Sequence, residues 1–301
     1  MIHAVMQRWK KGRRGLAAAF LLAAVAVSGR AGAATVEIGW TAWADAEFTT
    51  KLARRLIEDE LGHTVNLTLL DIALQYQGVA RGDLDAMLMA WLPDTHADYW
   101  KRYGQDIDDL GVLYENARLG WVVPAYVPES AVASIADLKK PAVADRLQRQ
   151  IYGIDPGAGL MRLSEEAMEA YGLDHYNLIR SSGAAMTAMV ERAHRRDRWI
   201  VATAWRPHWM FHTWDLRFLD DPKGALGGAE KIHALARKGL RNDLPDVAGL
   251  LSRMYLPLDE LEAAMGQAQE TSYDAAVDAY IAAHPDRIHY WLTGERKPES
   301  D

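Results

Sequence analysis

Residues 36–91, VEIGWTAWADAEFTTKLARRLIEDELGHTVNLTLLDIALQYQGVARGDLDAMLMAW, alternate short apolar runs with longer amphipathic segments. The apolar runs 36–40, 64–70 and 84–91 are typical of strands, and the last is almost continuously apolar, as in a strand buried on both faces. Segments 47–61 and 73–81 repeat apolar residues at helical spacing. Strands that alternate with helices form a parallel sheet. The sequence therefore predicts an α/β fold.

A second series of the same kind follows, which indicates a second lobe. Its expected strands are 119–127, 150–155, 177–180 and 199–205, and its expected helices follow Ser134 and cover 160–171 and 184–195. After Pro222 the strand signal fades, and helices are expected over 243–254, 259–269 and 272–283, packed back onto the first lobe. Periodicity lapses at Pro124 and over 219–228, where we place the crossings between lobes. The predicted limits are residues 34–122 with 222–301 for lobe 1 and 123–221 for lobe 2, with a hinge between them.

The N-terminus has the composition of an export signal. Five basic residues precede an apolar run over 16–27, and Ala31-Gly32-Ala33 fits the small-x-small cleavage rule. The run has twelve residues, whereas a membrane-spanning helix needs roughly 20. We therefore expect a signal peptide over residues 1–33, cleavage near Ala33 and a periplasmic mature chain. The chain has no cysteine, so the exported protein has no disulfides and depends on core burial for its stability.

The charge distribution argues against nucleic acid and anionic membrane surfaces as partners. The formal net charge is −7, and the first 33 residues hold six basic and no acidic side chains, so the remainder stands at −13. Such a body repels phosphate groups, and it lacks the basic stripes that bind nucleic acid. We expect a monomer that acts on small molecules.

Three tryptophan-bearing segments, 39–43, 90–96 and 204–210, lie where apolar strand-like runs end. Ligands of α/β proteins bind at the carboxyl ends of strands. Several indole faces around one cavity attract a quaternary ammonium, which has no N–H to donate. Burial as core residues is the alternative, since large aromatics are highly buried on average. Trp43, three residues after Trp40, either shares the cavity or caps the following helix.

Other motifs leave two interpretations each. The glycine-rich turn 153–159 presents amides to a carboxylate at a helix N-terminus, or is a tight structural turn. His208 and His212 have a metal-ligand spacing, but no cysteine or nearby carboxylate completes a set, and His208 suits a ligand carboxylate better. For His96 we favour a structural role. A helix cap explains Ser181-Ser182-Gly183 better than a nucleophile does. No catalytic motif is present, so we expect no enzyme, no cofactor and no metal.

With these segments the chain resembles the substrate-binding proteins of glycine betaine and choline type ABC importers, from Val36 to Leu292. The resemblance is carried by Ile38-Gly39-Trp40, by 91–96, by 153–159, by 181–186 and by 205–211. It implies a two-lobe periplasmic-binding-protein fold, with a parallel-type sheet in each lobe, that closes around one zwitterion or cation. It also implies an ABC permease as the partner that receives the ligand.

The resemblance also implies the site. Trp40, Trp91 and Trp205 become the walls of an aromatic cage, and Gly39, Trp40 and His208 become the carboxylate contacts. Choline-selective members carry an acidic residue two positions after the first tryptophan and a further aromatic near the second lobe. Ala42 and Leu119 stand at those places, which favours glycine betaine over choline. A choline or carnitine receptor, a ligand-sensing subunit, and an enzyme acting on a choline or carnitine derivative remain the alternatives.

Overall fold

The structure is a computed structural model, and it describes residues 32–296. The predicted signal peptide, residues 1–33, lies outside the described residues except for its last two. The fold that follows is that of the unit that starts at Ala33.

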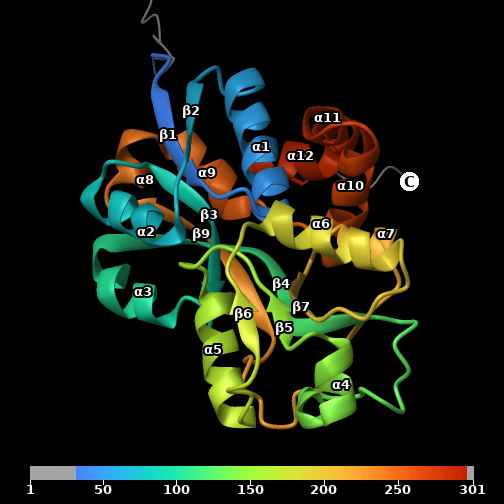
Figure 1. The fold of residues 1–301 in the computed structure, drawn as a ribbon. Helices are drawn as coiled ribbons and strands as arrows, with labels where there is room; N and C mark the ends of the chain where they lie inside the picture. The colour runs from blue at the N-terminus through green and yellow to red at the C-terminus, as the bar shows by residue number, and fades with distance from the viewer. Residues whose placement is uncertain (1–31, 297–301) are drawn as a thin grey trace, which may run out of the picture. The chain divides into compact units, whose positions relative to one another are not determined.

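Strands and helices alternate along the first two thirds of the described chain (Figure 1). The strands are β1 Thr35–Trp40, β2 Thr64–Leu69, β3 Ala86–Leu92, β4 Ile107–Pro124, β5 Gln150–Tyr152, β6 Asn177–Ile179, β7 Ala202–Arg206, β8 Leu216–Phe218 and β9 Glu230–Arg237. The α-helices are α1 Ala44–Asp59, α2 Ile72–Arg81, α3 Ala97–Tyr103, α4 Pro141–Arg146, α5 Gly159–Tyr171, α6 Gly183–His194, α7 Met210–Thr213, α8 Leu240–Asp243, α9 Pro245–Arg253, α10 Leu258–Glu270, α11 Tyr273–Ala283 and α12 Pro285–Thr293. Two 3₁₀ helices are η1 Gly104–Asp106 and η2 Ile135–Lys139.

The strands form one path in the order β2-β1-β3-β9-β4-β7-β5-β6, with β8 beside β4. The pairs β1–β2, β1–β3, β5–β6 and β5–β7 are parallel, as the alternating pattern predicts. β4 belongs to both parts of the path, because it pairs with β9 up to Ala117 and with β7 from Arg118. The α/β class is confirmed. The lobe limits stay a prediction, and the first of them falls within β4.

The strand β9 contradicts the prediction that strands end at Pro222. It runs antiparallel between β3 and β4, and its apolar run is interrupted by polar residues. Each of these polar residues has a partner on a neighbouring strand or just before it: Lys231 lies 3.4 Å from Glu115, His233 lies 2.9 Å from Asp109, and Arg237 lies 2.7 Å from Asp85. The cross-strand ion pairs therefore support a strand that hydrophobic periodicity does not reveal.

The C-terminal helices pack onto the first part of the fold, as predicted. Helices α10 and α11 contact α1, and α9 contacts β4 and β9; Figure 1 shows α10–α12 in red beside α1 in blue. All seven residues of β3 are buried, which confirms a strand covered on both faces. Helix α12, after Pro285, was not predicted.

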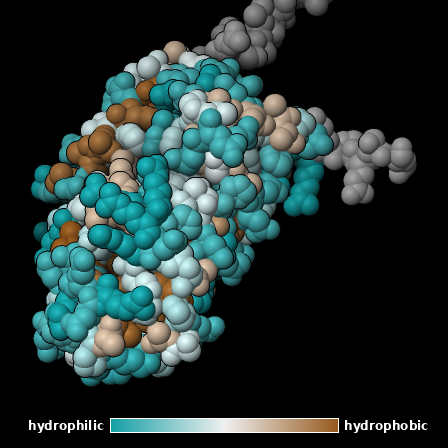
Figure 2. Space-filling model, turned by 45° about the vertical axis from the view of Figure 1, so that its right-hand side comes forward, coloured by the Kyte–Doolittle hydropathy of each residue, from teal (hydrophilic) through white to brown (hydrophobic). Residues whose placement is uncertain are grey.

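The surface is mainly polar. On the face shown in Figure 2, hydrophilic residues prevail and hydrophobic ones occur in small separate groups. The large hydrophobic side chains that are exposed in the described residues are Leu69, Leu74 and Tyr255. None of the helices in residues 32–296 combines the length and the apolar content that a membrane crossing needs.

Candidate ligand-binding site

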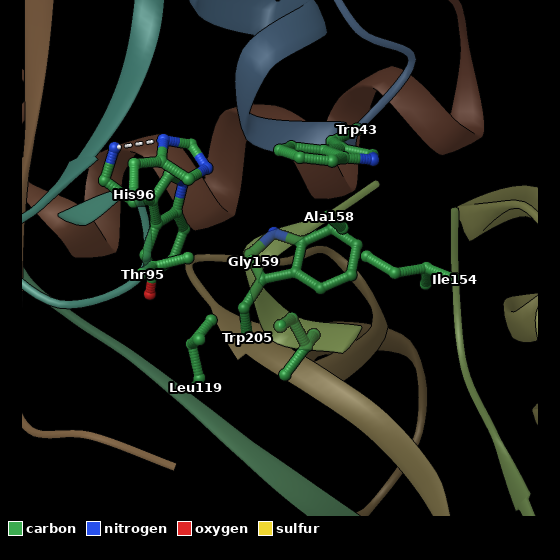
Figure 3. Close-up of a pocket in the computed structure, with 10 residues that line it drawn as sticks. Trp43, Thr95, His96, Leu119, Ile154, Ala158, Gly159 and Trp205 are labelled. Carbon is green, nitrogen blue, oxygen red and sulfur yellow. Dashed lines mark hydrogen bonds between the residues drawn. The ribbon is translucent and has the colours of Figure 1, made fainter. Parts of the chain in front are cut away.

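A pocket lies where five segments of the chain meet, and its space of about 280 Å³ includes a part that is open to solvent. Three of the side chains around it are tryptophans, and none carries a formal charge. The lining residues are Trp43, Trp91, Thr95, His96, Leu119, Ile154, Ala158, Gly159, Leu160 and Trp205. Figure 3 shows the Trp43 ring above the Trp205 ring, with His96 and Ile154 on opposite sides.

Local sequence explains how two of the tryptophans reach this position. Trp91 and Trp205 are each the next-to-last residue of a strand, β3 and β7, and Pro93 and Pro207 follow directly after the strand ends. Proline cannot donate to a strand ladder, so it ends the pairing and fixes the exit of the chain. Both rings are therefore held at the end of a buried strand.

Trp43 reaches the pocket by another route. It lies three residues beyond β1, in extended conformation, as the residue that precedes α1. Its ring centroid is 6.4 Å from that of Trp205, at an interplanar angle of 58°. Trp43 thus lies at the pocket, and although it directly precedes α1, its side chain makes no hydrogen bond that caps the helix.

Carboxylates fix the polar edges of two indoles. Trp43 donates its Nε1–H to Asp155 at 3.0 Å, and Trp205 donates its Nε1–H to Asp45 at 2.9 Å. Asp45 also accepts the Tyr114 hydroxyl at 2.7 Å. Burial raises the pKa of Asp45, and these two hydrogen bonds act in the opposite direction by favouring the carboxylate. Because the N–H edges are occupied, the ring faces are what the indoles can present to a ligand.

His96 supplies a neutral hydrogen-bond donor. Its Nδ1 accepts the Trp91 amide at 3.0 Å, so the ring proton is on Nε2. Burial, with the nearby charge of Arg162, lowers the pKa of His96 to about 3. Nε2 is buried and has no partner within the described structure. An unpaired buried donor is costly, and a ligand acceptor in the pocket would satisfy it.

The glycine-rich turn 153–159 also lies at the pocket. Ile154, Ala158 and Gly159 line it, and α5 begins at Gly159. The first amides of a helix have no partner within the helix, and the helix dipole makes this end partly positive. The turn therefore stands where a ligand carboxylate would be stabilised, which is the first of its two predicted interpretations.

Close contacts join this turn to the loop after β3. A Cβ added at Gly159 would lie 2.3 Å from the Thr95 carbonyl oxygen. Arg162 donates to the carbonyls of Asp94 and Thr95 at 3.2 and 3.4 Å. The loop is held from its other side by Glu230, which accepts the amides of Asp94 and Thr95 and the Thr95 hydroxyl. His96 and the start of α5 are thus fixed against each other as one wall.

The structure separates the predicted contacts Trp40 and Gly39 from this pocket, because neither residue lines it. Trp40 ends β1, paired with Leu69, and its carbonyl accepts the Leu70 amide at 2.9 Å. A Cβ at Gly39 would lie 2.6 Å from Leu84 Cδ1 and 3.1 Å from Gln75 Cγ. Gly39 is therefore required by packing beneath α2, and the tryptophan at the pocket is the one in the loop after the strand.

His208 lies behind Trp205. It is buried and lines a neighbouring chamber together with Trp43 and Trp205. Its ring meets Trp205 edge to face at 4.6 Å, and its Nδ1 accepts the Met210 amide at 3.0 Å. Burial lowers the pKa of His208 to about 3. The geometry makes His208 a support for the Trp205 ring.

The structure also bears on Ser181-Ser182-Gly183 and on the possible metal ligands. Ser182 accepts the Ala185 amide at 3.2 Å and caps α6, as predicted. Within residues 32–296 no group of three or more potential metal-ligating side chains is gathered.

A model of the OpuAC family, the substrate binding domain of the ABC-type glycine betaine transport system, matches residues 34–283. The chain belongs to this family. Members are substrate-binding components of transporters, as predicted, rather than enzymes.

Individual proteins agree with the family match. The glycine betaine/carnitine transport binding protein GbuC of Listeria monocytogenes is 37% identical over 168 residues, 55% of this chain and 56% of that relative. The chain thus spans little more than half the length of that relative. Lactococcal OpuAC, closed around glycine betaine, has 35% identity and a TM-score of 0.79, with 86% of this chain and 99% of that chain covered. An ABC-transporter choline binding protein, solved with choline, has 26% identity and a TM-score of 0.78, with 88% and 94% covered. The predicted periplasmic-binding-protein fold is confirmed.

The position of Trp43 also changes the comparison with choline-selective members of the family. Ala42, two positions after Trp40, is not acidic, and on that count choline is disfavoured. The tryptophan at the pocket is Trp43, however, and the residue two positions after Trp43 is the acidic Asp45. One of the two predicted departures therefore disappears, whereas Leu119 remains where a further aromatic was expected.

Sequence reasoning missed several residues of the pocket. His96 was given a structural role, yet it both bonds the Trp91 amide and lines the pocket. Leu119 stands where a further aromatic is expected, and Ile154 lies in the glycine-rich turn, so both positions could be found from the sequence. Thr95 carries no distinguishing pattern of its own. The position of His96, five residues after a strand-end tryptophan and past a proline, is the signal that could have been used.

Proposed function

We propose that this chain is the exported receptor of an ABC importer and binds glycine betaine, or a close quaternary ammonium relative, in a cage of Trp43, Trp91 and Trp205. The observation that carries the proposal is the meeting of three indoles at one pocket whose lining side chains have no formal charge. A methylated cation has a low hydration cost and suits such a surface, whereas an ammonium with N–H donors would lose hydrogen bonds to water there.

The estimated binding free energy is sufficient for a ligand receptor. Each desolvated cation–π contact contributes about 2 kcal/mol, and one or two charge-assisted hydrogen bonds add roughly 1.5–3 kcal/mol each. Ordering and closure subtract from this gross gain. An affinity in the micromolar range, about −8 kcal/mol, is the expected result.

The polar side of the pocket supports a ligand with a carboxylate. His96 Nε2–H has no partner within residues 32–296, and the N-terminus of α5 lies at the same pocket. A betaine carboxylate can accept hydrogen bonds from both, and its negative charge suits the partly positive end of the helix. The trimethylammonium and the carboxylate of glycine betaine thereby find opposite kinds of surface in one pocket.

Choline is the second candidate, favoured by Asp45 two positions after Trp43. Against it, both oxygens of Asp45 are already engaged, Oδ1 by Trp205 and Oδ2 by Tyr114, and Asp45 does not line the pocket. Choline would also leave His96 with a hydroxyl in place of an anion. We therefore place choline behind glycine betaine.

The proposal also includes export of the chain to the periplasm. The basic, apolar and small-residue pattern of residues 1–33 supports cleavage near Ala33 and a periplasmic receptor. The receptor would deliver its ligand to the membrane permease of the same importer and would act as a monomer.

The test is isothermal titration of the mature chain with glycine betaine and with glycine, which differ only by three methyl groups on nitrogen. We expect micromolar binding of glycine betaine and at least a hundredfold weaker binding of glycine. Trp91→Ala is expected to remove most of the affinity for glycine betaine while circular dichroism shows an unchanged fold. Equal affinities for the two ligands would contradict the cage.

A further inference from the structure

A second, larger chamber shares two walls with the inner pocket. Trp43 and Trp205 line both spaces, and the space of about 1150 Å³ in the chamber includes a part that is open to solvent. Its walls come from the β1–α1 loop, α1, α6, the segment around α7, and helices α10 and α11. The lining residues are Ala42, Trp43, Ala44, Glu47, Gly183, Ala184, Thr187, Ala188, Glu191, Trp205, His208, Trp209, Thr213, Trp214, Gln269 and Tyr273.

The chamber combines aromatic rings with negative charge. Trp209, Trp214 and Tyr273 line it in addition to the two shared indoles, and the centroids of Trp209 and Trp214 are 5.3 Å apart. Its charged lining residues are Glu47 and Glu191, which are ion-paired with Lys51 and Arg195, two residues outside the lining. Aromatic faces and carboxylates attract organic cations. This composition differs from that of the inner pocket, whose lining side chains carry no formal charge.

The chain's own Lys51 demonstrates this chemistry at the chamber. Its ammonium lies 5.0 Å from the centroid of the Tyr273 ring and 2.8 Å from Glu47. Burial raises the pKa of Tyr273, and the negative charges of Glu47 and Asp45 raise it further.

We propose that this outer chamber is a second, weaker binding site for quaternary ammonium cations, and that it holds the cation before the cation passes Trp43 and Trp205 into the inner pocket. The first half stands on the chamber alone, and the second half rests on the proposed function. Cation–π contacts at exposed sites are weaker than desolvated ones, so the chamber binds in the millimolar range.

The two sites differ in what they offer a carboxylate. His96 and the start of α5 attract one in the inner pocket, whereas the acidic residues of the chamber, Glu47 and Glu191, are already paired with Lys51 and Arg195. The chamber therefore binds tetramethylammonium and glycine betaine with similar affinity, whereas the inner pocket prefers glycine betaine. This difference separates a true second site from residual binding at the first.

The test uses the Trp91→Ala variant of the mature chain, because Trp91 lines the inner pocket and not the chamber. Saturation-transfer NMR at constant ionic strength follows its titration with tetramethylammonium chloride. We expect saturable millimolar binding, at least tenfold weaker when Trp209→Ala or Glu191→Gln is added. Trp199→Ala, which removes a half-buried indole stacked on Arg146 elsewhere, is the matched control and leaves the binding unchanged.

The exposed Glu191→Gln keeps the test valid if Trp209→Ala fails to fold. Binding that does not saturate, or that neither variant weakens, overturns the second site. Stopped-flow kinetics of glycine betaine with otherwise wild-type chain test the passage. Trp209→Ala slows association and dissociation by the same severalfold factor and leaves the affinity unchanged, because Trp209 lines the chamber and not the inner pocket. Unaltered rates overturn the passage. Failure of the wild-type chain to bind glycine betaine overturns the proposed function instead, and the tetramethylammonium titration still decides the chamber.

Discussion

His96 is the residue whose two nitrogens have separate tasks. Nδ1 accepts the Trp91 amide and fixes the ring beside the three tryptophans, and Nε2 holds the proton that faces no partner in residues 32–296. Because the pKa of about 3 keeps the ring neutral, His96 is a donor without a positive charge, as the proposed quaternary ammonium ligand requires.

The prediction at this scale is that His96→Ala weakens glycine betaine binding about tenfold to a hundredfold, which corresponds to the roughly 1.5–3 kcal/mol of a charge-assisted hydrogen bond. The affinity for choline falls by a smaller factor than that for glycine betaine, because a neutral hydroxyl accepts a weaker hydrogen bond than a carboxylate does. Isothermal titration of both ligands measures the difference. A parallel loss for both ligands would show that His96 only supports Trp91.

The sequence predicts only some of the tryptophans that line the pocket, and the reason is local geometry. Trp91 and Trp205 sit at proline-terminated strand ends, so their place follows from strand periodicity and the missing N–H of proline. Trp40 sits at a strand end too, but its carbonyl bonds Leu70 and its side chain lies away from the pocket lining. Trp43 reaches the pocket from the loop before α1. Periodicity assigns residues to strands and does not tell how a loop turns.

At the scale of elements, the contact between α5 and the loop after β3 shapes the pocket. Gly159 lies so close to the Thr95 carbonyl that a side chain there has no room, and Arg162 and Tyr99 add bonds across the same contact. The lack of a side chain at Gly159 thus sets how closely the helix N-terminus approaches His96.

Gly159→Ala is therefore expected to push the start of α5 away from the loop and to lower the affinity for glycine betaine at least tenfold. Gly157→Ala is the matched control, since a Cβ there meets no atom within 4 Å, and it leaves the affinity within about twofold. Titration calorimetry measures both variants, and thermal unfolding checks their folds. Equal affinities in the two variants would mean that the close contact does not shape the site.

Other elements show where sequence patterns stop being informative. Helices α1, α2, α5 and α6 match their predicted ranges closely because their apolar residues recur at helical spacing. Strand β9 escaped prediction because its polar residues are paired on β3 and β4, which is a property of tertiary structure. The length of β4 escaped for a similar reason, since two different strands pair with its two parts.

At the scale of the whole molecule, the chain holds two histidines that remain neutral inside the fold. His96 and His208 are 0% and 2% exposed, and burial lowers the pKa of each to about 3. In the unfolded chain both return to a pKa near 6.5. Between about pH 6.5 and pH 3 the unfolded state therefore binds more protons than the folded state, and the stability contributed by these groups is lost as the pH falls through this window.

We predict that the free energy of unfolding decreases by about 1 kcal/mol for each of these histidines between pH 7 and pH 5.5. The buried carboxyls Asp45 and Glu230 act in the opposite direction, because burial raises their pKa values, so comparison of variants isolates the histidines. Urea unfolding of the ligand-free chain at both pH values measures the effect. His208→Gln should lose about 1 kcal/mol less stability on acidification than the wild type. His175→Gln, at an exposed position, should match the wild type, and equal losses in all three chains would show that neutral buried histidines do not govern the acid sensitivity.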